Sequence, residues 1–257
     1  MRPLELLAPA KNLETGIAAI EHGADAIYIG AEQLGARSAA GNSVEDIAQL
    51  CQYAKQFGVK VYVTLNVIVY EHEIDYCQKL ITQLYEAGVD ALIVQDMGVL
   101  KMDIPPIELH ASTQTDNRTA DKVAWLKSLG FARVVLAREL SLDAIKAIHK
   151  QEPDVELEVF VHGALCVSYS GVCYVSQHSF GRSANRGECA QFCRMSFDLV
   201  DSDDREIEHQ RHLLSLKDMC RINELEQLAD AGATSFKIEG RLKDVSYVKN
   251  VVSAYRK

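Results

Sequence analysis

The sequence contains no long apolar run. None approaches the ~20 residues that a transmembrane helix requires, so the chain is not expected to enter a membrane. An excess of positive charge is also missing: the net charge is −9. A broadly basic surface for nucleic acid is therefore excluded, and any phosphate contact must come from a local patch. The opening residues Met1–Leu7 become charged too early for a secretory signal, which favours a cytoplasmic protein.

The common signatures of hydrolytic and nucleotide-dependent enzymes are absent as well. The chain has no Gly-x-Ser-x-Gly, no His-Glu-x-x-His and no P-loop. A peptidase built on this sequence would have to use a cysteine, or a serine or aspartate outside any such motif.

One pattern recurs along the chain. A helical periodicity ends at a glycine, and a short β-branched strand follows within a few residues. The glycine suits the left-handed position that closes a helix. The strands are mostly apolar, as parallel strands covered by helices must be. Five glycines mark this unit: Gly23, Gly58, Gly88, Gly130 and Gly232.

Three further strands, at Leu4–Ala8, Ile107–Ser112 and Glu156–Val161, bring the number to eight. Eight βα units in 257 residues predict a single (β/α)8 TIM-like barrel domain over residues 1–257. An open, doubly wound sheet is the alternative, because the pattern does not distinguish a closed sheet from an open one. The intervening helices are expected at Asn12–His22, Val44–Phe57, Ile74–Ala87, a short Met97–Met102, Thr119–Leu129, Leu142–Lys150, Ile222–Ala231 and Val245–Tyr255.

The segment of residues 166–212 lies between the seventh and eighth strands. It is far longer than a usual βα loop. An alternating run with a polar turn at residues 195–207 predicts a small hairpin in this segment. Because the seventh strand leads directly into it, the insertion should lie on the C-terminal face of the barrel, where active sites of such barrels lie.

Four cysteines crowd into this insertion: Cys166, Cys173, Cys189 and Cys193. Four thiolates in a glycine-rich loop are a typical way to hold a soft metal centre. Zinc and an iron–sulfur cluster both accept four thiolates, and the spacing matches neither the usual zinc pairs nor the ferredoxin run. Four thiols without a metal are the remaining alternative. Cys51 and Cys77 are expected to be buried apolar residues, and Cys220 a core residue or a substitute for one of the four.

Polar side chains gather at the predicted C-terminal ends of the strands, where a barrel meets its substrate. Glu139, His162 and Glu239 are the catalytic candidates, the first two as acid–base groups. Arg138 and Arg241 suit an anion such as a carboxylate or phosphate. The alternative role for each of them is to tie loops together. The other candidates for substrate binding are Asn66, Asp96 and Gln114, and His110 and Lys237 fall at similar positions.

Three arginines, Arg182, Arg186 and Arg194, flank the cysteines. They are the only concentrated basic patch on an acidic chain. One interpretation is that they contact RNA phosphates beside the metal centre. The other is that they neutralise a negatively charged metal–thiolate centre or lie in a solvated loop.

Six motifs stand out along the chain: Glu158–Ser176, Leu6–Ala10, Tyr28–Gly30, Arg182–Cys189, Leu214–Asp218 and Phe236–Arg241. Together they resemble the peptidase U32 family over essentially the whole chain. The family is named for collagenase-like proteases. The resemblance is strongest to members that hydroxylate a pyrimidine in tRNA or 23S rRNA without using molecular oxygen. It implies a [4Fe–4S] cluster on Cys166, Cys173, Cys189 and Cys193, and prephenate as the small-molecule oxygen donor.

The last two cysteines are spaced as in the RNA-modifying branches rather than the ubiquinone branch of this family. RNA-modifying members usually continue well beyond the position of Lys257. Two interpretations follow: the chain is a short form, or it is the catalytic domain of a longer protein whose C-terminal region carries the RNA-binding surface. The alternatives to RNA hydroxylation are a U32 collagenase-like peptidase and a partner-dependent protein with a structural zinc.

Overall fold

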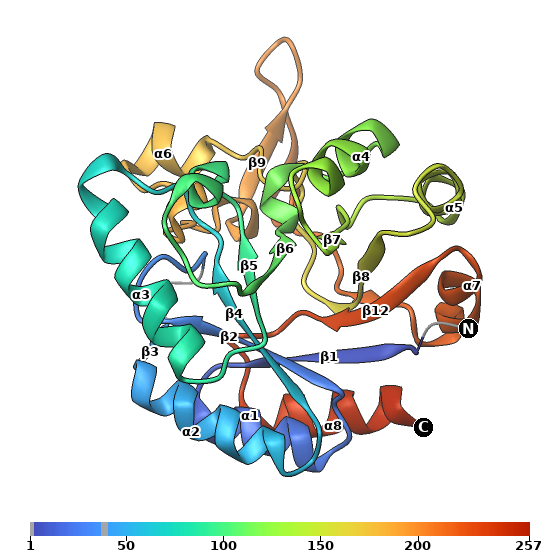
Figure 1. Ribbon diagram of the computed structural model, residues 1–257. Helices are drawn as coiled ribbons and strands as arrows, with labels where there is room; N and C mark the ends of the chain where they lie inside the picture. Colours follow the sequence, from blue (N-terminus) through green and yellow to red (C-terminus); the bar gives the residue numbers. More distant parts are fainter. Residues whose placement is uncertain (1–2, 37–40) are drawn as a thin grey trace.

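A computed structural model of the chain describes residues 3–36 and 41–257, and the eight predicted strands close into a parallel barrel (Figure 1). Strand β1 pairs with both β2 and β12, which joins the two ends of the sheet. The closed barrel is therefore confirmed over the open sheet. Its strands are β1 Glu5–Ala10, β2 Ala26–Ala31, β4 Lys60–Leu65, β5 Ala91–Val94, β6 Glu108–Ala111, β7 Arg133–Val135, β8 Glu156–Gly163 and β12 Ala233–Ile238.

Helices surround the barrel on the outside, and their ends follow the local sequence signals. Ser43 and Ser141 cap α2 and α5 by accepting the backbone N–H of Asp46 and Ala144 at 3.1 and 3.2 Å. The five helix-closing glycines all have positive φ, as predicted. No helix in the described residues is long and apolar enough to cross a membrane. The helices are α1 Leu13–Glu21, α2 Val44–Lys55, α3 Ile74–Glu86, the 3-10 helix η3 Met97–Lys101, α4 Ala120–Ser128, α5 Leu142–Gln151, α7 Leu225–Asp230 and α8 Val245–Arg256.

Two apolar layers hold the barrel together. The larger lies between strands and helices and includes Cys51 and Cys77, both buried as predicted. The smaller lies inside the barrel and is built around Tyr28, Tyr62 and Phe160. Alternate residues of each strand supply the two layers, because successive side chains of a strand point to opposite faces.

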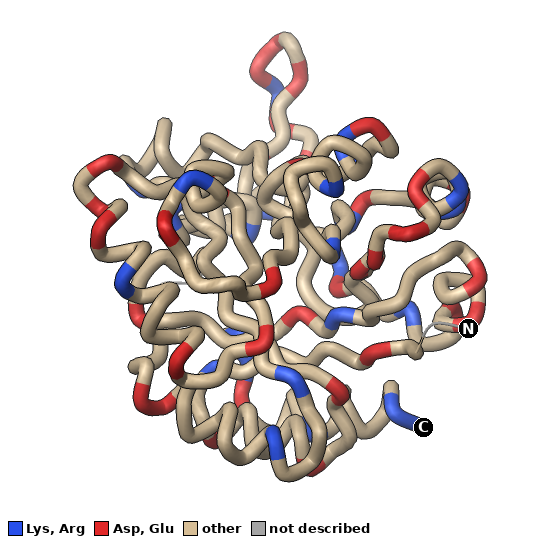
Figure 2. The backbone as a smooth tube through the Cα atoms, viewed as in Figure 1, with Lys and Arg blue, Asp and Glu red and all other residues tan. Residues whose placement is uncertain are grey.

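The insertion contains the predicted hairpin, β9 Phe197–Val200 and β10 Glu206–Arg211, which projects away from the barrel with an acidic tip (Figures 1 and 2). Ahead of it lie α6 Val175–Phe180 and two 3-10 turns, Ala184–Arg186 and Phe192–Arg194. After the hairpin, the two-residue strand β11 Met219–Cys220 pairs antiparallel with the end of β8. The prediction that Cys220 lies in the core is therefore wrong: it is exposed, and its neighbour Met219 is the residue of this added strand that packs against the inner layer.

Candidate functional site

A cavity of about 320 Å³ opens at the C-terminal end of the barrel, between the strand ends and the insertion. Side chains from inside the barrel form its floor, among them Tyr28, Phe160 and Lys237. The insertion forms its wall through residues 166–176 and parts of 184–193. All four predicted metal ligands, Cys166, Cys173, Cys189 and Cys193, line this one cavity.

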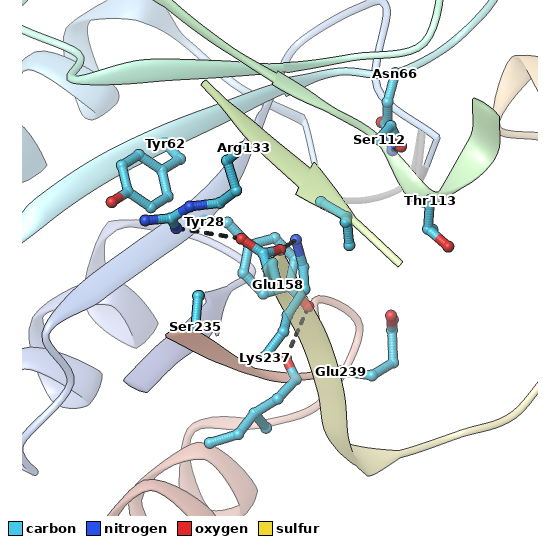
Figure 3. Close-up of polar contacts among 12 residues, drawn as sticks. Tyr28, Tyr62, Asn66, Ser112, Thr113, Arg133, Glu158, Ser235, Lys237 and Glu239 are labelled. Atoms are coloured by element: carbon cyan, nitrogen blue, oxygen red, sulfur yellow. Dashed lines mark hydrogen bonds and ion pairs between the residues drawn. The ribbon is translucent and has the colours of Figure 1, made fainter. Parts of the chain in front are cut away.

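The floor carries a buried charge network (Figure 3). Lys237 Nζ donates to Glu158 Oε1 at 2.6 Å and lies 4.3 Å from the centre of the Tyr28 ring. Arg133 approaches the other oxygen of Glu158 at 3.3 Å. Burial alone would raise the pKa of Glu158, but Lys237 and Arg133 outweigh it and hold that pKa below its usual value. Burial also lowers the pKa of Lys237, against the attraction of Glu158.

The wall of the cavity adds two arginines to this cationic floor. Arg138 pairs with Glu239 at 2.9 Å, and its guanidinium lies 3.8 Å from the centre of the Phe160 ring. Its Nε is buried and has no hydrogen-bond partner among the described residues. Arg241 donates to Thr64 Oγ1 at 2.6 Å. These groups favour an anionic ligand, since the cationic side chains are concentrated where water is largely excluded.

Five predicted residues, Asn66, Gln114, Arg138, Glu239 and Arg241, line the cavity. Asn66 is fixed there by two hydrogen bonds: its Oδ1 accepts the backbone N–H of Ala36 at 3.0 Å, and its Nδ2 donates to Ser112 Oγ at 3.2 Å. The five residues come from the ends of different strands, which the closed barrel brings to one mouth.

Two predicted carboxylates lie outside the cavity lining and hold loops instead. Glu139 accepts the backbone N–H and the hydroxyl of Ser170 at 3.2 Å each, which ties the cysteine-rich insertion to the strand β7 side of the mouth. Asp96 accepts the backbone N–H groups of Val69 at 2.9 Å and Gly98 at 2.7 Å. Both carboxylates therefore act as loop anchors in this structure.

His162 was expected at the mouth, and the structure places it outside the barrel. Lys237 pairs with Phe160 and the next residue, Ile238, pairs with His162, so β8 contains one extra residue at this point. Such a bulge turns the following side chain to the other face of the sheet. The His162 ring consequently packs against Tyr255 and Tyr247 of α8. His110, also expected near the strand ends, is fully buried inside the barrel and does not reach the cavity.

The arginines beside the cysteines clamp the insertion in place. Arg186 donates to Glu73 at 2.9 Å and to the carbonyl of Ile68, and Arg194 donates to the carbonyl of Leu165 at 2.6 Å. Both guanidinium groups are therefore engaged by partners within the protein. Arg182 is exposed and lies outside the cavity lining.

The four sulfur atoms are not gathered at the spacing of a tetrahedral zinc site. Burial raises the pKa of Cys193, and the nearby Arg194 lowers it. The charges of Cys166 and Cys189 raise this pKa further, so both thiols lie close enough to Cys193 to influence its charge. Within the described residues, no three of the four sulfurs lie mutually within 4.8 Å. Tetrahedral zinc with Zn–S bonds of about 2.3 Å would bring its sulfurs to about 3.8 Å from one another. A four-iron cluster spreads its four thiolates more widely.

Gly171 decides how closely the insertion packs on the barrel. Its φ is +78°, and a Cβ added there would lie 2.1 Å from the carbonyl oxygen of Gln114.

We predict that Gly171→Ala displaces the segment between Cys166 and Cys173 and strongly reduces metal content. Gly181→Ala is the matched control: its φ is +64° and nothing lies within 4 Å of an added Cβ, so it should cost only about 1–2 kcal/mol of backbone strain. Metal content and thermal stability of the two variants distinguish the effects; equal metal loss in both would contradict this role.

The family model for peptidase family U32 matches residues 11–257. The chain belongs to this family. It is 56% identical over 253 residues to the 23S rRNA 5-hydroxycytidine C2501 synthase of Escherichia coli, and 40% identical over 263 residues to tRNA hydroxylation protein P1 of Bacillus subtilis. A collagenase of Porphyromonas gingivalis is 36% identical over 269 residues. Each alignment covers 98% of this chain, but only 39%, 62% and 64% of these relatives in turn.

Among solved structures, the U32 peptidase Mk0906 has the same fold, with a TM-score of 0.56 at 13% identity over 93% of this chain and 94% of that one. At this identity the likeness concerns the fold alone. It agrees with the (β/α)8 barrel that both the sequence pattern and the strand pairing give.

Most residues of the cavity floor are not evident from the sequence. Tyr28, Thr64 and Phe160 line it, and each belongs to a strand that reads as a buried apolar run. Lys237 falls among the polar residues near the strand ends, but the sequence alone assigns it no role in the site. A signal for it exists in the alternation Ser235, Lys237, Glu239 within an otherwise apolar strand, which predicts polar side chains on the inner face.

Proposed function

We propose that this chain is the catalytic barrel of an enzyme that hydroxylates a pyrimidine in RNA, with an iron–sulfur cluster bound by Cys166, Cys173, Cys189 and Cys193. One observation carries the proposal: the four cysteines line the same cavity as the cationic side chains of the barrel mouth. The names of two relatives, an rRNA 5-hydroxycytidine synthase and a tRNA hydroxylation protein, support the reaction class.

The chain's own residues can bind and orient the two reactants. The cavity can admit a flipped-out base between the insertion and the barrel floor. Arg138, Arg241 and Lys237 are suited to the carboxylates of a small oxygen donor such as prephenate. Replacing C–H by C–OH is a two-electron oxidation of the base. The oxygen donor would take up those two electrons as it gives up its hydroxyl group and gains the hydrogen, and a bound cluster would supply electron-transfer capacity between the two.

The peptidase alternative has weaker support. Serines line the cavity, including Ser112 and Ser170, but no histidine does so among the described residues. His162 faces α8, and Ser170 bonds Glu139, a carboxylate that also holds the loop backbone. A serine nucleophile needs an adjacent base that is itself oriented by a third group, and the cavity offers no such set.

Two experiments test the cofactor and the reaction separately. The first is purification of the protein under anaerobic conditions. We expect brown protein with broad absorption near ~400 nm, as thiolate-bound iron–sulfur centres show, and about four iron and four sulfide per chain. Mass spectrometry of rRNA and tRNA from a strain that lacks the gene should reveal loss of one hydroxylated pyrimidine, restored by the intact gene. Colourless protein with one tightly bound zinc, and an unchanged set of modified nucleosides, would contradict the proposal.

A further inference from the structure

An open groove of about 520 Å³ lies beside the cavity. It runs between Ile68 and Tyr70 on one side and the start of α6 on the other. Groove and cavity share a wall, because five residues line both of them: Gln114, Gly171, Val172, Tyr174 and Asn185. A linear polymer with one unit in the cavity would therefore place a neighbouring unit in this groove.

Gln95 gives the groove a buried acceptor. It follows β5 on the same face as Ile93, which lines the cavity, and only 8% of it is exposed. Its Nε2 donates to the backbone carbonyl of Gln114 at 3.4 Å. Its Oε1 is buried and has no hydrogen-bond partner within the described residues. An unmade bond of this kind costs free energy that a donor on a ligand would recover.

Tyr174 gives the same groove an open aromatic face. It is 59% exposed and forms part of the shared wall. Tyr70, on the opposite side, already has the Arg186 guanidinium 4.5 Å from its ring centre and the His72 ring stacked at 5.8 Å. Tyr174 is therefore the tyrosine on which a planar ligand can stack. Lys122 also lines the groove and supplies a positive charge.

A buried amide oxygen, an exposed aromatic ring and a lysine are what a protein uses to read one unpaired nucleotide. We propose that this groove binds the nucleotide next to the target pyrimidine, and that it selects a base with an exocyclic amino group. The base stacks on Tyr174, its amino group donates to Gln95 Oε1, and Lys122 meets the phosphate. Cytosine and adenine carry such an amine, whereas uracil has a carbonyl oxygen in its place. The inference rests on the proposed RNA function and deepens it.

Binding of short RNAs tests the groove independently of catalysis. Fluorescently labelled octamers of cytidine and of uridine are titrated with the anaerobically purified protein, and anisotropy gives both affinities. Wild type should bind oligocytidine about tenfold more tightly than oligouridine. Gln95→Met removes the acceptor, so it should lose most of this preference by weakening the cytidine complex alone. Because the cavity can prefer one base by itself, the change in preference on mutation is the decisive quantity.

Two tyrosine variants serve as a matched pair. Tyr174→Ala should weaken both octamers about tenfold, since it removes a stacking surface that every base can use. Tyr85→Ala removes a tyrosine of similar exposure, 43%, near the far end of α3, and should change neither affinity. Thermal melting verifies that each variant is folded.

The outcomes separate this inference from the proposed function. If wild type binds RNA but Gln95→Met keeps the full cytidine preference, or Tyr174→Ala binds as wild type does, the groove assignment is wrong and the RNA function stands. If wild type binds neither octamer, the groove assignment is wrong, and the RNA function is decided by the hydroxylated pyrimidine in the strain that lacks the gene.

Discussion

Cys173→Ala and Cys189→Ala are each expected to lose the metal centre and at least about 100-fold of hydroxylation activity. Each replacement removes one of the four cysteines that line the cavity and are proposed to bind the cluster. Iron and sulfide content, absorption near ~400 nm and the hydroxylated nucleoside measured by mass spectrometry should fall together.

Cys220→Ala is the matched control, because Cys220 is an exposed cysteine of the neighbouring β11 that does not line the cavity. It should keep wild-type metal content and activity. Full activity of Cys173→Ala or Cys189→Ala after loss of iron would show that the reaction does not depend on the cluster.

Glu158→Ala is expected to destabilise the barrel by about 3–5 kcal/mol. Glu158 is fully buried and neutralises Lys237 at 2.6 Å and Arg133 at 3.3 Å. Without it, the buried ammonium group of Lys237 loses its ion-pair partner in a medium that solvates it poorly, whereas Arg133 keeps its pairs with Glu5 and Glu156. For a domain of this size the loss corresponds to a fall of about 10 °C in Tm.

Glu152→Ala provides the comparison, because Glu152 pairs with the half-exposed Lys127 at 3.0 Å. Loss of a surface pair of this kind costs about 1 kcal/mol or less. Thermal and denaturant unfolding of the two variants measure the difference. Equal stability of Glu158→Ala and Glu152→Ala would show that the buried network adds nothing to stability beyond a surface pair.

The residues that line the site show which of its positions local sequence can predict. Asn66, Arg138 and Arg241 follow or end strands, and a closed parallel barrel carries all such positions to one mouth. The position of the cysteines after the seventh strand placed them on the same face. For these residues the sequence was sufficient, because position along a strand determines position along the barrel axis.

The exceptions share one cause: the direction of a side chain depends on long-range pairing. His162 follows Phe160 by two residues, so simple alternation points it inward, yet one extra residue in β8 turns it toward α8. Arg186 and Arg194 look free for phosphate in the sequence. Their partners Glu73 and Leu165 lie 113 and 29 residues away and become visible only when the chain is folded.

The sequence by itself determined the eight βα units, the glycines that close the helices, and the cysteine-rich insertion on the C-terminal face. These features depend on local backbone preference and on the two-residue repeat of a strand. Tertiary structure alone decided that Lys237 and Glu158 pair beneath the cavity, that Glu139 anchors the insertion, and that Gln95 and Tyr174 flank one groove. Those arrangements join residues from distant elements, and their energies come from burial and charge, which arise only when the barrel closes.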